Sequence, residues 1–102
     1  MDIQAIDKEY VANTYPRYPV TLTEGSGARL LDENGKTYID LGSRIAVNTF
    51  GAADGEWCAA VTAQLKKLQH SSNYYYTEPG ALLARELCRR TGMKKVFFGN
   101  SG

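Results

Sequence analysis

The sequence predicts an α+β fold in which a small antiparallel sheet is followed by the beginning of an α/β layer. Residues 20–41 alternate apolar and polar side chains around an Asn-Gly pair, which is typical of antiparallel hairpins. Two longer segments then carry apolar residues at helical spacing. Finally, the apolar run "KKVFF" at 94–98 has the length of a strand and follows a helix, as in a βα unit.

The first expected element is a short helix from about Ile3 to Thr14. The segment "YPRYP" at 15–19 excludes helix, because each proline fixes its own φ and pushes the preceding residue towards extended geometry. The helix must therefore end before the prolines. Its apolar residues, which fall roughly on one side, are Ile3, Ile6, Tyr10 and Val11.

Three short strands form the expected meander. The segment 24–27, "EGSG", is expected to turn the chain between the first and second strands, so its glycines need no ligand to explain them. Asn34-Gly35 is expected to turn it between the second and third, because both residues accept positive φ at little cost. The strands are "VTLT" at 20–23, "ARLLD" at 28–32 and "TYIDL" at 37–41.

Two amphipathic helices are expected after the sheet. Asp54 is a suitable N-cap for the first, and Thr77 with Pro79 opens the second. Gly92 is a suitable residue to end the second helix. The apolar residues are Trp57, Val61, Leu65 and Leu68 on the first helix and Leu83, Ala84, Leu87 and Cys88 on the second.

Composition narrows the class of protein. The 102 residues are 43% hydrophobic and 23% charged, and a net charge of +1 gives no electrostatic footprint for nucleic acid or an anionic membrane. The first residues are too polar for a signal peptide, and no apolar run has the length of a membrane span. Cys58 and Cys88 lack metal-ligand spacing, so we expect two buried, reduced thiols and a cytoplasmic protein; a disulfide is the alternative.

The segment "GNSG" at 99–102 is the first candidate for chemistry. Small residues at the end of a strand let successive backbone amides and the Ser101 hydroxyl converge on an anion. An ordinary strand-to-helix turn is the alternative. The single histidine, His70, has no evident catalytic partner, and we expect it to complement the carbonyls at a helix end.

Three consecutive tyrosines, Tyr74–Tyr76, lie in the loop between the two helices. Three aromatic rings are too much apolar surface to leave in water, so at least one or two should be buried. They could be buried within this chain or against a second subunit.

The order and spacing of five motifs resemble the amino-terminal quarter of class III aminotransferases, in particular the acetylornithine group. The similarity extends from about Tyr15 to Gly102. The resemblance implies a fragment of a fold-type I pyridoxal-phosphate-dependent transferase. Residues 1–50 would then belong to a small domain, residues 51–77 would form a connection, and residues 78–102 would be the truncated start of the large cofactor-binding domain. The motifs are "DENGKTYID", "IAVN", "SNYYYTEP", "TGMKKVFF" and "NSG".

The resemblance also implies site residues. Ser101 and Gly102 would help to hold the phosphate of pyridoxal 5'-phosphate, which favours the anion interpretation of "GNSG". Tyr15 matches a tyrosine that contacts the substrate carboxylate, and Arg44 stands where acetylornithine enzymes usually have glycine. Its guanidinium could fill the substrate pocket or seek a carboxylate, or it could turn to solvent. The tyrosine loop would lie near the interface of a homodimer.

The reaction implied by the resemblance is ping-pong transamination between an amino donor, which we expect to be N-acetylornithine in arginine biosynthesis, and 2-oxoglutarate. Ornithine, succinylornithine and 4-aminobutyrate aminotransferases are alternatives, and a stand-alone binding or interaction module is a rival from another class. The family's catalytic lysine lies outside this stretch, so the 102-residue chain should be inactive and is not expected to hold the cofactor. No metal, nucleic acid or membrane is implied.

Overall fold

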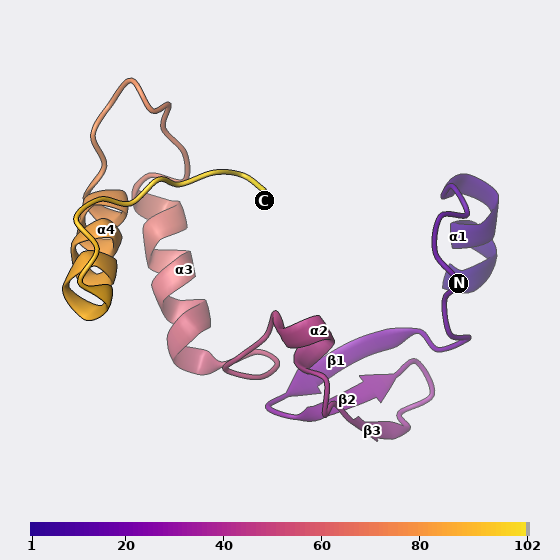
Figure 1. Cartoon of the computed structure of the whole chain (residues 1–102). Helices are drawn as coiled ribbons and strands as arrows, with labels where there is room; N and C mark the ends of the chain where they lie inside the picture. Colours follow the sequence, from indigo (N-terminus) through magenta and orange to yellow (C-terminus); the bar gives the residue numbers. More distant parts are fainter. Residues whose placement is uncertain (102) are drawn as a thin grey trace. The chain divides into compact units, whose positions relative to one another are not determined.

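A computed structural model describes residues 1–101 of the chain (Figure 1). The chain forms two compact units, one spanning Met1–Ala63 and one beginning at Gln64. The elements are α1 (Ile3–Tyr10), β1 (Leu22–Ser26), β2 (Arg29–Asp32), β3 (Thr37–Ile39), α2 (Ser43–Ala46), α3 (Gly55–Lys67) and α4 (Glu78–Thr91).

Helix α1 begins where a capping residue allows it and ends earlier than predicted. The Asp2 carboxylate accepts a hydrogen bond of 2.9 Å from the backbone N–H of Ala5, which makes Asp2 the N-cap. The expected extension to Thr14 is wrong, because Val11 already has extended geometry. After the turn, Arg17 reaches back to form an ion pair of 3.3 Å with Asp7.

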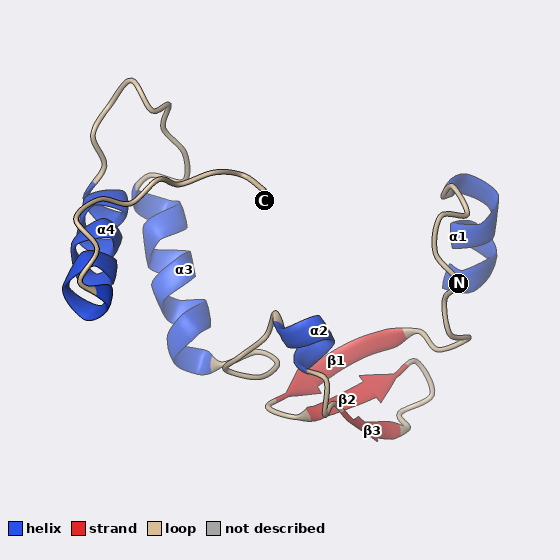
Figure 2. Ribbon diagram, in the orientation of Figure 1, coloured by secondary structure: helices blue, strands red, loops and turns tan. Residues whose placement is uncertain are grey.

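The three-stranded antiparallel meander is confirmed, with strand order β1-β2-β3 (Figure 2). Strand β1 is displaced from the prediction, because Glu24, Gly25 and Ser26 pair with β2 and do not form a turn. The chain reverses at Gly27, where φ is +58°. Gly25 faces Leu30 across the pair of strands, and this close approach leaves no room for a side chain.

Asp32 organises the turn between β2 and β3. Its Oδ1 accepts hydrogen bonds from the backbone N–H groups of Asn34 (2.9 Å) and Lys36 (3.0 Å), and its Oδ2 accepts one from the Tyr38 hydroxyl (3.0 Å). Partial burial acts to raise the pKa of Asp32, but these hydrogen bonds and the nearby Lys36 charge outweigh burial. The pKa of the carboxyl therefore lies below its ordinary value. The left-handed φ of +77° falls on Gly35.

Few residues of the first unit are buried. Leu30 and Ala52 are each 6% exposed, and they are the buried apolar residues of the part of the chain that the structure describes. Ala52 is held against the β1–β2 turn by two backbone hydrogen bonds, from Gly27 N–H to Ala52 O (3.0 Å) and from Ala52 N–H to Gly27 O (2.8 Å). The small core thus lies where the segment after α2 returns to the sheet.

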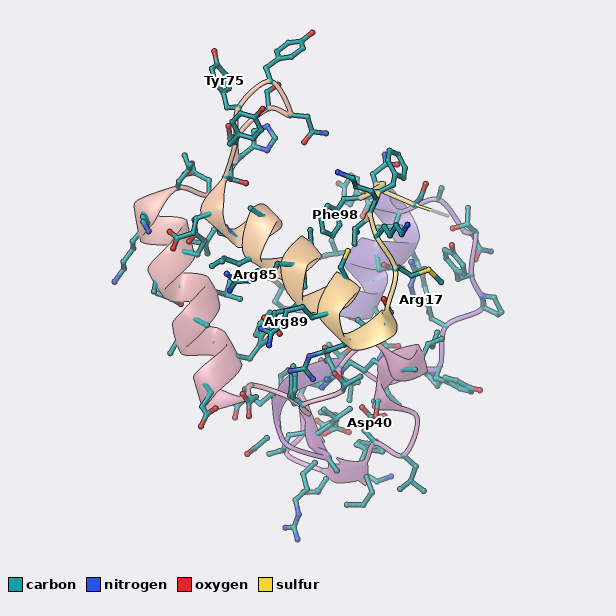
Figure 3. All side chains as sticks on the ribbon, turned by 60° about the vertical axis from the view of Figure 1, so that its left-hand side comes forward. Arg17, Asp40, Tyr75, Arg85, Arg89 and Phe98 are labelled. Atoms are coloured by element: carbon teal, nitrogen blue, oxygen red, sulfur yellow. The ribbon has the colours of Figure 1, made fainter. Side chains whose placement is uncertain are left out.

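Both long helices begin at the predicted residues, although the Thr77 side chain makes no capping hydrogen bond at the start of α4. The Asp54 carboxylate accepts a hydrogen bond of 2.8 Å from the backbone N–H of Trp57, which confirms Asp54 as the N-cap of α3. Helix α4 follows Thr77, has proline in its first turn and ends at Gly92 in the left-handed conformation. Figure 3 shows Arg85 and Arg89 projecting from α4. Glu86 forms ion pairs with both, of 3.9 and 3.1 Å.

The expected strand at 94–98 is not formed; this segment is drawn as a loop in Figure 2. A strand needs a neighbour to receive its backbone hydrogen bonds, and none of the described strands pairs with this segment. Phe97 and Phe98 remain exposed as a result. The local sequence favours extended backbone, but pairing decides whether a strand forms.

The tyrosines and cysteines are more exposed than predicted. Tyr75 is 72% exposed and extends from the loop before α4 in Figure 3, and Tyr74 and Tyr76 are more exposed still. Burial of the tyrosine loop within this chain is therefore wrong. Cys58 is exposed and Cys88 half-buried, so the expectation of buried thiols is also wrong, although both are free as predicted.

Candidate functional site

Two hollows lie in the unit that spans Met1–Ala63. The larger has a volume of about 570 Å³ and lies between α1 and the proline-containing segment that follows it. Tyr15 is part of its wall, together with Tyr18 and the ion-paired Asp7 and Arg17. Tyr15 itself is largely exposed, so its hydroxyl is available to a ligand.

The second hollow, of about 370 Å³, is formed by β1, β2 and the segment after α2. Buried Leu30 and Ala52 give it an apolar floor, and half-buried Arg44 is part of its wall. Glu24 also lines the wall of the hollow, but Glu24 is exposed and forms no ion pair with Arg44. The lining of this hollow therefore combines apolar surface with one basic and one acidic side chain that form no ion pair with each other.

The backbone conformation at Arg44 and its neighbours is unusual. Four successive non-glycine residues, Ser43 to Ala46, have left-handed φ values between +46° and +63°. Each such residue is unfavourable for an L-amino acid by about 1–2 kcal/mol. The turn is closed by hydrogen bonds from Ala46 N–H to Gly42 O (2.9 Å) and from Val47 N–H to Ser43 O (3.0 Å). Strain of this kind is concentrated at functional sites.

The Asp40 carboxylate fixes the start of this turn. Its Oδ1 accepts a weak hydrogen bond of 3.4 Å from the backbone N–H of Arg44. That bond leaves the Arg44 guanidinium free: within residues 1–101 it makes no hydrogen bond and no ion pair. In the sequence, residues 43–46 stand out only because their apolar residues follow neither helical nor strand spacing. No glycine or asparagine occurs at the four left-handed positions.

The segment at 99–102 is described only in part. The Ser101 hydroxyl is exposed and lies 3.4 Å from Asn100 Oδ1, while Gly102 lies outside the described residues. No acidic side chain occurs from Met93 to the end of the chain, whereas Lys94 and Lys95 are positively charged. A hydroxyl donor beside glycine, without a competing carboxylate, fits one side of a phosphate site.

The four predicted site residues are distributed over the two units. Tyr15 and Arg44 line different hollows of the first unit, Ser101 belongs to the second unit, and Gly102 is not described. Among the described residues, no cluster of histidine, cysteine and acidic side chains could hold a metal ion. The described helices also include none that is long and apolar enough to cross a membrane.

Comparison with known proteins identifies the class. A family profile for class III aminotransferases matches residues 10–102, and the chain belongs to this pyridoxal-phosphate-dependent family. Two acetylornithine aminotransferases are similar over nearly all of the chain: the protein of Haemophilus ducreyi is 47% identical over 98% of this chain, and that of Methanopyrus kandleri is 46% identical over 100% of it. The chain spans about a quarter of the length of these relatives, 25% and 27% respectively.

Solved structures agree on the fold. The N-acetylornithine aminotransferase of Stenotrophomonas maltophilia is 37% identical with a TM-score of 0.79, over 91% of this chain and 24% of that one. The ornithine delta-aminotransferase of Plasmodium falciparum is 26% identical with a TM-score of 0.87, over 92% of this chain and 24% of that one. The predicted α+β fold, as part of a fold-type I transferase, is confirmed apart from its last strand.

Proposed function

We propose that the chain is the amino-terminal part of an aminotransferase that moves an amino group from N-acetylornithine to 2-oxoglutarate in arginine biosynthesis. The observation that carries this proposal is the 46–47% identity to acetylornithine aminotransferases over essentially the whole chain. The identity to an ornithine aminotransferase is 26% over a similar stretch. We expect the complete protein to act as a cytoplasmic homodimer.

Pyridoxal 5'-phosphate would supply the electron-withdrawing chemistry of the reaction when bound. Ser101 and Gly102 would hold its phosphate, because a serine hydroxyl and glycine amides can approach an anion closely. Lys94 and Lys95 add positive charge to the same segment. We do not expect the 102-residue chain to transfer amino groups by itself, because it is about a quarter of its relatives' length and the family's catalytic lysine would lie in the remainder.

Tyr15 and Arg44 would contact the amino donor. Each lines a hollow large enough for part of a small amino acid, and each presents a hydrogen-bond donor that other described residues leave free. The exposed tyrosine loop would meet the second subunit, since burial within the chain does not occur. The proposal includes the division of the chain into three parts. Residues 1–50 would belong to a small domain, residues 51–77 would form a connection, and residues 78–102 would begin the large cofactor-binding domain.

The test is amino transfer by the full-length protein supplied with pyridoxal 5'-phosphate and 2-oxoglutarate. Glutamate formation should be fastest, as kcat/KM, with N-acetylornithine, compared with ornithine, succinylornithine and 4-aminobutyrate. Preference for one of the other three would assign the protein to that activity. No glutamate from any of them would favour a binding or interaction role.

A further inference from the structure

Helix α1 contacts the rest of its unit through polar side chains. Gln4 and Asp7 are three residues apart, and therefore on the same side of the helix, and they are its half-buried residues. Gln4 Nε2 donates a hydrogen bond of 3.3 Å to Thr21 Oγ1. Asp7 Oδ2 forms the ion pair of 3.3 Å with Arg17 Nη1 (Figure 3). The larger apolar side chains of the helix are all exposed, namely Ile3, Ile6 and Tyr10. These two polar contacts therefore set the position of α1 more than burial of apolar surface does.

The segment 12–20, which follows α1, has few restraints of its own. Within the part of the chain that the structure describes, its backbone N–H groups make two hydrogen bonds, each of 2.8 Å and each to a carbonyl only two residues earlier. Pro16 and Pro19 stiffen the segment locally, but a fixed φ cannot set its place against the helix. The place of the segment that carries Tyr15 therefore depends on its side-chain contacts with α1.

The ion pair joins α1 to the segment close to Tyr15. Arg17 is two residues from Tyr15, and Pro16 between them limits how far the two can move apart. Tyr15, Arg17 and Asp7 all line the larger hollow. The side chains of Arg17 and Asp7 are 48% and 35% exposed, and an ion pair in such a setting adds little to the overall stability of a protein. Its effect is therefore expected on the local segment, where it holds Tyr15 at the wall of the hollow.

We infer that Asp7 and Arg17 are positioning residues of the amino-donor site. Their ion pair holds residues 15–17 against α1 and so presents the Tyr15 hydroxyl to the ligand, while neither charged group contacts the donor itself. This inference rests on the proposed function, because it takes Tyr15 as a contact of the amino donor. It adds a role for α1, which the proposed function leaves without one.

The experiment measures kcat and KM of the full-length holoenzyme with whichever of N-acetylornithine, ornithine, succinylornithine and 4-aminobutyrate it uses best. Asp7→Asn and Arg17→Gln should each raise the KM of that donor about 2- to 5-fold with little change in kcat, as expected for the loss of an exposed ion pair that supports binding. A double variant that combines Asp7→Arg with Arg17→Asp restores opposite charges at the two positions. It should recover part of the lost affinity.

A double-mutant cycle separates positioning of Tyr15 from a general structural effect. Tyr15→Phe should raise the KM of the donor, and Arg17→Gln added to it should raise the KM no further, because the hydroxyl that Arg17 positions is absent. Arg29→Gln is the matched control. It removes an exposed arginine on β2 that forms no ion pair among the described residues, and it should leave the KM unchanged. Thermal midpoints should match that of the wild type. Additive losses in the cycle, or swapped charges that recover nothing, would overturn the inference.

The free choice of donor keeps this test distinct from that of the proposed function. If the protein prefers a donor other than N-acetylornithine and the cycle is non-additive with that donor, the proposed function fails and the positioning role of Asp7 and Arg17 stands. If N-acetylornithine is preferred and Arg17→Gln leaves its KM unchanged, the positioning role fails and the proposed function stands. Absence of amino transfer from all four donors would overturn both.

Discussion

At the scale of single residues, Asp32 shows how one side chain stabilises a turn. The sequence predicted the position of this turn but not the contacts that hold it. The Asn-Gly pair predicted a reversal of the chain, and local residue preferences were sufficient for that. The sequence alone could not show that the carboxylate two residues earlier accepts three hydrogen bonds and has a lowered pKa. That arrangement depends on Tyr38 returning from β3.

Replacing Asp32 with asparagine should destabilise the protein in a pH-dependent way. Because the folded pKa is lowered, the carboxylate contributes stability above its unfolded pKa of about 3.9, and this contribution is lost as the pH falls through the folded pKa. The free-energy difference between wild type and Asp32→Asn, measured by denaturant unfolding of the full-length protein, should be largest near pH 7 and shrink below about pH 4. Glu33→Gln, one residue away, should show no such trend; a constant difference for Asp32→Asn would refute the argument.

Gly51 should tolerate no side chain. Its φ is +87°, and a Cβ at this position would lie 2.7 Å from the Gly27 Cα. We expect Gly51→Ala to reduce the free energy of unfolding by about 1–3 kcal/mol, because it combines backbone strain with a clash against main chain. Gly55→Ala is the matched control: nothing lies within 4 Å of its Cβ, and alanine suits the first turn of α3, so stability should stay or rise. Equal effects at both glycines would contradict this explanation.

At the scale of elements, prediction succeeded where the determinants are local. Asp54 and Gly92 marked the limits of helices because a cap acts on backbone within one turn. Prediction failed at 94–98, where an apolar run needs hydrogen-bond partners from elsewhere in the chain. It also missed the left-handed turn at 43–46, because none of its residues belongs to the types that usually adopt positive φ.

Residues 94–98 should become a strand in the full-length protein. Extended, apolar backbone that finds neighbouring strands acquires a ladder of hydrogen bonds. Amide hydrogen exchange should therefore be slow at these residues in the full-length protein and fast in the 102-residue chain. Helix α4 should be the internal reference in both. Fast exchange at 94–98 in the full-length protein would show that the segment is not part of a sheet.

At the scale of the whole molecule, the chain exposes more apolar side chains than a complete domain would leave in water. The apolar face of α3 includes Trp57 and Leu65, each more than half exposed, and the tyrosine loop is more exposed still. The sequence identified these faces by their period but could not say what covers them. The relatives that the chain matches are about four times as long, and we propose that elements of a longer protein, or of a second subunit, cover these faces.

Tyr75 provides the test of the expected homodimer. If the tyrosine loop meets the second subunit, Tyr75→Ser should weaken dimerisation of the full-length protein by about 10- to 100-fold, as loss of a buried aromatic contact does. Sedimentation equilibrium measures this. Tyr10→Ser changes a similarly exposed tyrosine on α1 and should leave the dimer intact. Equal dimer strength in both variants would remove the tyrosine loop from the interface.

The central claim is that this chain begins an enzyme that uses pyridoxal phosphate to take the amino group from N-acetylornithine. It is tested most directly by titrating the full-length protein with N-acetylornithine, without 2-oxoglutarate, while the absorption spectrum of the bound cofactor is followed. We predict that one equivalent per subunit converts the visible band to that of the aminated cofactor, and that 2-oxoglutarate restores it. A protein that shows no cofactor band, or whose band responds to 4-aminobutyrate and not to N-acetylornithine, would contradict the claim.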